Sequence, residues 1–91
     1  MNLQDALFNW LQIKVVSDAR KDDNAAKETL DFFETILRED HHLSEFGVER
    51  VDETMYHVRY EADGKRKTQF FDRELVDQLL ADINSNPKYN D

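Results

Sequence analysis

The sequence predicts an α+β domain with the element order α-α-β-β-β-α, in which helices pack on one face of a three-stranded antiparallel meander. Three observations lead to this fold class. Apolar residues recur at helical spacing over residues 3–37, they alternate with polar residues from Phe46 to about Phe71, and helical spacing returns after Asp72. Because 91 residues supply one hydrophobic core, we expect a single domain over residues 1–86 and a frayed tail at residues 87–91.

The first helix is expected to begin after Asn2, which can cap it, and to run to about Val16 or beyond. Its apolar residues span well over half of the helix circumference, which is wider than the stripe needed to face one core. They are Leu3, Ala6, Leu7, Phe8, Trp10, Leu11, Ile13, Val15 and Val16. Either this helix is central and buried on several sides, or Phe8, Leu11 and Val15 form an exposed patch that pairs with another subunit or partner.

A second helix is expected to start at a cap formed by Asp23 or Asn24. Its main apolar residues fall four, three and four residues apart, which is typical of one buried helix face. These residues are Ala26, Leu30, Phe33 and Leu37, with Ala25, Phe32 and Ile36 widening the same side. The opposite face carries Lys27, Glu28, Asp31, Glu34, Arg38 and Glu39, and the break over residues 41–47 ends the helix.

Two tight turns join the predicted strands. With Asp52-Glu53-Thr54 as the first loop, Val48 lies opposite Val58 and Phe46 lies opposite Tyr60.

For the second turn we prefer a three-residue loop over residues 62–64, because it pairs Tyr56 with Phe70 and keeps one face of the sheet apolar. A two-residue loop would instead place Val58 opposite Gln69.

The final helix has a clear start signal. Asp72 is a suitable cap, and Phe71 before it and Val76 within the first turns are spaced for a hydrophobic staple. The apolar side of this helix consists of Leu75, Val76, Leu79, Leu80 and Ile83.

The sequence predicts no catalytic residue, no cofactor and no metal, and therefore no enzyme. Cysteine is absent, and the two glycines are too few for a phosphate-binding loop. The adjacent His41 and His42 lack the spacing that puts two metal ligands on one helix face. We interpret them as residues of the last helical turn, where an imidazole interacts favourably with the negative end of the helix dipole.

The net charge of −8 disfavours direct binding of nucleic acids and anionic membranes, and it favours basic partners. The one basic run, Lys65-Arg66-Lys67, lies beside the second turn, where Glu61 is expected opposite Lys65. In topology alone, the α-β-β-β-α order from residue 24 resembles double-stranded-RNA-binding domains. Those domains carry a basic cluster at the start of the last helix, whereas this chain has Asp72-Arg73-Glu74 there. The resemblance in topology therefore does not predict that this chain binds double-stranded RNA.

These observations favour a protein–protein interaction or regulatory module. In one version the protein is a homodimer through the first helix, with Phe8, Leu11 and Val15 as contacts. In another, Glu28, Asp31, Glu34 and Glu39 form a docking site for a basic protein, for example as an acidic decoy that competes with nucleic acid.

A third version is a small-ligand site at the sheet. Strand alternation argues against it, because Tyr56 and Tyr60 project from one face while His57 and Arg59 project from the other. The start of the chain lacks the basic region of a signal peptide and no apolar stretch is long enough for a bilayer span, so we expect a cytoplasmic protein.

Overall fold

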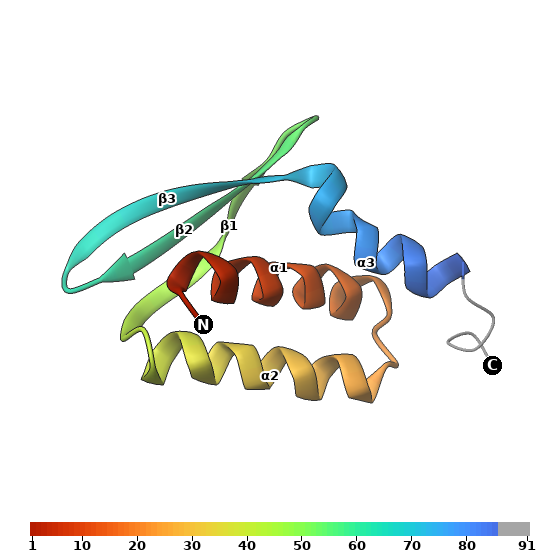
Figure 1. Ribbon diagram of the computed structural model, residues 1–91, viewed down its shortest axis with the longest axis horizontal. Coiled ribbons are helices and arrows are strands. Elements are labelled where there is room, and N and C mark those ends of the chain that lie inside the picture. The colour runs from red at the N-terminus through yellow and green to blue at the C-terminus, as the bar shows by residue number, and fades with distance from the viewer. Residues whose placement is uncertain (86–91) are drawn as a thin grey trace.

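The computed structural model describes residues 1–85 and confirms the predicted element order. The elements are α1 (Leu3–Ala19), α2 (Asn24–Glu39), β1 (Leu43–Val51), β2 (Met55–Ala62), β3 (Lys65–Asp72) and α3 (Arg73–Ser85). The strands form one antiparallel sheet in the order β1-β2-β3. Figure 1 shows α1 between the sheet and α2, with α3 beside the C-terminal half of α1. The predicted tail at residues 87–91 lies outside the described residues.

Each helix begins at a side-chain cap predicted from the sequence. The Oδ1 atom of Asn2 accepts a hydrogen bond from the backbone N–H of Asp5 at 2.8 Å. The Oδ1 atoms of Asp23 and Asp72 accept in the same way, over 3.0 and 3.2 Å, from the residues three positions later. These bonds satisfy backbone donors that have no partner within the first turn of a helix.

The chain between α2 and β1 differs from the prediction. Helix α2 ends at Glu39, so His41 and His42 follow the helix instead of occupying its last turn. His42 has a positive φ of 56°, and β1 begins directly after it at Leu43, three residues before the alternation visible in the sequence.

Helix α1 is buried on several sides within one subunit. Leu7, Trp10 and Leu11 belong to the main core beneath the sheet. Ile13 and Val16 form a second cluster with apolar residues of α2 and α3. The wide apolar arc of α1 is therefore explained by a central position between three neighbours.

The first hairpin has the predicted pairing at its centre. Val48 lies opposite Val58, and Phe46 lies opposite Tyr60. A bulge after Val48 shifts the register by one residue near the turn, where Val51 lies opposite Tyr56.

The preferred register of the second hairpin is wrong. The turn is a two-residue loop, Asp63-Gly64, in which both residues have positive φ, 53° and 75°. Positive φ at both turn residues is what a type I′ turn requires, and the twist of that turn matches the right-handed twist of the flanking strands. Consequently Tyr56 pairs with Phe71, which is buried, while Phe70 points to the opposite face and is 51% exposed.

Because of the same difference in register, the charge pair beside this turn also differs from the predicted pair. Glu61 lies opposite Arg66 rather than Lys65, and its carboxylate is 3.6 Å from the Arg66 guanidinium.

Candidate functional site

The three α1 residues predicted to bind a partner differ in exposure. Leu11 is fully buried and is a core residue of the subunit. Phe8 and Val15 are half-buried. Phe8 lies under β3, with its ring centroid 5.9 Å from that of Phe71. Val15 lines a groove of about 420 Å³ between α1 and the end of β1, together with Val48 and Val51.

The four predicted carboxylates of α2 do not form one group. Glu28, Asp31 and Glu39 are exposed, but Glu34 is half-buried and accepts a hydrogen bond from the indole Nε1 of Trp10 at 3.1 Å. Trp10 is 1% exposed, so Glu34 satisfies a buried donor of the core. Glu34 thus has a structural partner that the sequence pattern did not reveal.

The prediction that Ala25 and Phe32 lie on the apolar side of α2 is wrong, because both are exposed. Phe32 is 60% exposed. Its ring is held edge-on against Phe33, with centroids 5.4 Å apart. At 100° per residue, Phe32 lies about 140° around the helix from the buried Leu37, a separation that could have identified it as exposed.

An acidic and aromatic surface results, which we call the α2 outer face. All its members are exposed and lie within one sector of the helix: Glu28, Asp31, Phe32, Thr35 and Glu39. None of its three carboxylates forms an ion pair within residues 1–85. The face therefore combines an accessible ring with carboxylates that no lysine or arginine of residues 1–85 pairs with.

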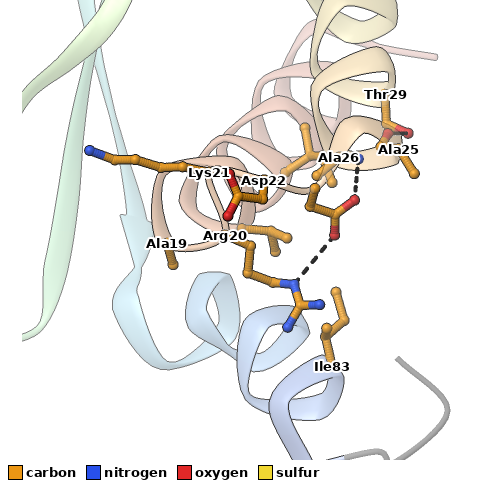
Figure 2. A pocket seen from close by; sticks show the side chains of 11 residues that line it. Ala19, Arg20, Lys21, Asp22, Ala25, Ala26, Thr29 and Ile83 are labelled. Atoms are coloured by element: carbon orange, nitrogen blue, oxygen red, sulfur yellow. Dashed lines mark hydrogen bonds and ion pairs between the residues drawn. The ribbon is translucent and has the colours of Figure 1, made fainter. Parts of the chain in front are cut away.

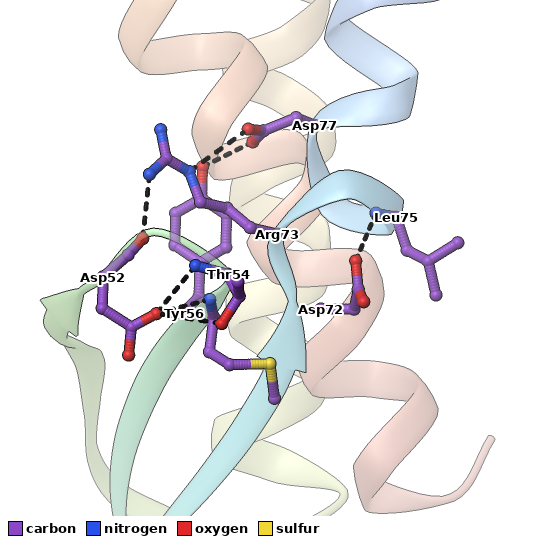
Figure 3. Close-up of polar contacts among 8 residues, drawn as sticks. Asp52, Thr54, Tyr56, Asp72, Arg73, Leu75 and Asp77 are labelled. Carbon is purple, nitrogen blue, oxygen red and sulfur yellow. Dashed lines mark hydrogen bonds and ion pairs between the residues drawn. The ribbon is translucent and has the colours of Figure 1, made fainter.

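A polar cluster connects the β1–β2 turn with α3 (Figure 3). The Asp52 carboxylate accepts from the backbone N–H groups of Thr54 and Met55 at 2.9 and 2.7 Å, and its other oxygen lies 2.7 Å from His57 Nε2. The hydrogen bond with His57, followed by those from the two backbone N–H groups, holds the pKa of Asp52 well below its ordinary value.

On the other side of the same turn, Arg73 donates to the backbone oxygen of Asp52 at 2.8 Å, and Tyr56 donates its hydroxyl to Asp77. Burial, together with the Asp77 carboxylate, raises the pKa of Tyr56 to about 12. A neutral phenol that donates to a carboxylate fixes the start of α3 against β2.

This cluster does not assemble a reactive group. The ring of His57 packs edge-on against Phe70 on the outer face of the sheet, whereas Tyr56 lies on the inner face. The hydroxyl of Thr54 lies 3.5 Å from Asp52, so it shares the carboxylate with His57 instead of bonding to the imidazole. The arrangement serves to close a turn and anchor a helix.

A pocket of about 720 Å³ opens where the α1–α2 loop meets α3 (Figure 2). Its floor is apolar, with Ile13, Val16 and Ile83, and its rim carries Arg20 and Asp23. The Asp23 carboxylate accepts from Arg20 and also caps α2. Of the four charged residues that line the pocket, Arg20 and Asp23 are thus used in the fold, whereas Lys21 and Asp22 are exposed.

Among residues 1–85, no three histidine, aspartate or glutamate side chains are placed to hold a metal ion. No described helix is long and apolar enough to cross a membrane. Comparison of the chain with protein-family models, curated proteins and solved structures gives no match.

Proposed function

We propose that this protein is a binding module for another protein, and that the α2 outer face takes a partner with a basic surface. The observation that carries this proposal is Phe32, a large ring that is 60% exposed among carboxylates that have no ion-pair partner in the described part of the chain. Exposed aromatic residues that are already fixed in orientation are frequent anchors of protein interfaces, because they lose little conformational entropy on binding.

The charge of the face defines the class of partner. Glu28, Asp31 and Glu39 surround the ring on the same sector of the helix. Lysine and arginine side chains of a partner would pair with them, while an apolar side chain of the same partner covers Phe32. Glu34 is not part of this proposal, because it is engaged with Trp10.

Dimerisation through α1 receives less support than it did from the sequence. Leu11 is fully buried, and the residues beside it on the arc are already half-covered by the sheet. Little apolar surface is left on α1 for a second subunit to bury.

The proposal is tested by affinity capture from extracts of the native cell, comparing the wild-type protein with Phe32→Ser and with the double change Glu28→Lys and Asp31→Lys. The matched control is Leu75→Ser, which removes a hydrophobic side chain that is 62% exposed on α3. We expect wild type and control to retain the same basic protein and both α2 variants to lose it.

With that partner purified, Phe32→Ser should weaken binding by roughly 30-fold, corresponding to an interface anchor of about 2 kcal/mol. Binding to wild type should also weaken as salt is raised. If the partner binds Phe32→Ser as tightly as wild type, or lacks a basic surface, the α2 outer face is not the binding site.

A further inference from the structure

Strand β3 is an open edge of the sheet. It pairs with β2 on one side only, and its register runs without a bulge from Lys65 to Asp72. The other edge, β1, is interrupted by two register shifts. Bulges of this kind protect an edge from pairing with another chain, so β3 is the edge that a further strand could extend.

The hairpin turn determines which backbone groups of β3 face outward. A two-residue turn makes its flanking pair, Ala62 and Lys65, exchange hydrogen bonds, and such pairs then alternate along the ladder. The N–H and C=O groups of Arg66, Thr68 and Phe70 therefore point away from β2. No hydrogen bond within residues 1–85 uses them.

The side chains of these three residues lie on the outer face of the sheet, and all three are exposed. Arg66 lies at the basic end of β3, and Phe70 lies at the other end, followed by Asp72. The strand is thus basic at its start and aromatic and acidic at its end.

We propose that a second copy of this chain occupies the edge, so that two β3 strands pair antiparallel about a twofold axis at Thr68. An antiparallel arrangement brings the basic end of each strand to the acidic end of the other. Arg66 then lies opposite Phe70 of the second copy, in position for a cation–π contact, and diagonal to Asp72 of the second copy. The outward backbone groups of each strand all meet a complementary group.

Position and charge both favour this occupant. In Figure 1 no helix lies along the outer edge of β3, where a second sheet would continue the first. A polyanion would meet the basic run but would leave the outward backbone groups and Phe70 without partners.

The test is the oligomeric state of the purified chain by analytical ultracentrifugation, with Thr68→Pro and Thr68→Val compared. Proline removes an outward N–H that the subunit itself does not use, whereas valine keeps it. Because the axis duplicates each change, Thr68→Pro should raise the Kd of the dimer by roughly 100-fold. Thr68→Val should leave the dimer intact, and circular dichroism checks that both variants fold.

A second variant keeps the backbone unchanged. Arg66→Glu should raise the dimer Kd by roughly tenfold, because it replaces a cation by an anion opposite Phe70 and near Asp72 of the second copy.

A third measurement is chemical cross-linking, which is possible because the chain contains no cysteine of its own. A short bis-maleimide should join the two copies of a Thr68→Cys variant, while it should not join two copies of a Thr35→Cys variant, in which the cysteine lies on α2.

A wild-type chain that stays monomeric at millimolar concentration, or a dimer that Thr68→Pro leaves unchanged, would overturn the proposal. So would a monomer that binds RNA or an acidic peptide through Lys65-Arg66-Lys67. None of the Thr68 and Arg66 variants alters the α2 outer face, so failure here is distinguishable from failure of the proposed function.

Discussion

Replacing Glu34 by alanine tests whether this carboxylate belongs to the core or to a docking surface. Its partner, Trp10, is 1% exposed, and the indole Nε1 donates to Glu34 Oε2 over 3.1 Å. Alanine removes the acceptor and leaves the indole N–H without one. A buried donor that loses its partner costs about 1–3 kcal/mol, so we expect the free energy of unfolding to fall by about 2 kcal/mol. That is a large fraction of the roughly 5–15 kcal/mol typical of a whole domain.

Two controls separate this hydrogen bond from a general effect of charge. Glu34→Gln keeps an oxygen that can accept from Trp10, and it should cost less than about 1 kcal/mol. Glu28→Ala removes an exposed carboxylate from the same helix, and it should change stability by no more than about 0.5 kcal/mol.

Urea denaturation followed by tryptophan fluorescence is the suitable assay, since the chain contains a single tryptophan and the signal reports on Trp10 itself. The midpoint should fall for Glu34→Ala while the slope with urea stays constant. If Glu34→Ala and Glu28→Ala unfold at the same urea concentration, the hydrogen bond contributes nothing to the fold, and Glu34 returns to the set of available docking residues.

Three further variants test other parts of the structure. Leu11→Ala removes most of a fully buried side chain, so the free energy of unfolding should fall by about 2–5 kcal/mol; a loss below about 1 kcal/mol would contradict its place in the core. Gly64→Ala puts a side chain at a φ of +75° and should cost about 1–2 kcal/mol by urea denaturation, whereas Gly47→Ala, where the backbone has no positive φ, should be neutral or stabilising. The absorbance difference between wild type and Tyr56→Phe should show a phenol that ionises near pH 12 instead of 10.0. Because the folded state holds this proton more tightly, the stabilisation from Tyr56 is complete below pH 10.0 and is lost as pH rises through 12; ionisation near pH 10.0 in the folded protein would contradict the buried contact with Asp77.

Local signals in the sequence were sufficient for the elements and for the starts of the three helices. The caps at Asn2, Asp23 and Asp72 depend on one side chain and the backbone a few residues later, so they can be identified without knowledge of the fold. The start of β1 was missed because residues 43–45 show no clear alternation, although the backbone already pairs with β2 from Leu43.

The candidate site was only partly visible in the sequence because its exposure depends on what packs nearby. Periodicity separates Phe32 from the buried Leu37 by about 140° and could have predicted its exposure, whereas whether Glu34 is covered depends on the neighbouring helix. The contact between Glu34 and Trp10 joins residues on different helices, and no spacing within the chain encodes it. The same reasoning applies to α1, whose wide apolar arc is compatible with burial by its own subunit or by another.

The wrong register at the second hairpin has a consequence for the edge of the sheet. The longer loop was preferred because it placed Tyr56 beside Phe70, an apolar pairing, but the turn residues Asp63 and Gly64 both adopt the positive φ that a two-residue loop requires. A shift of one residue moves every side chain of β3 to the other face of the sheet. In the predicted register Phe70 would lie beneath the sheet, whereas in the structure Phe71 fills the core and Phe70 is exposed at the edge. The aromatic end of the proposed dimer contact therefore depends on the conformation of two turn residues, which is why Gly64→Ala tests the basis of that contact as well as the hairpin.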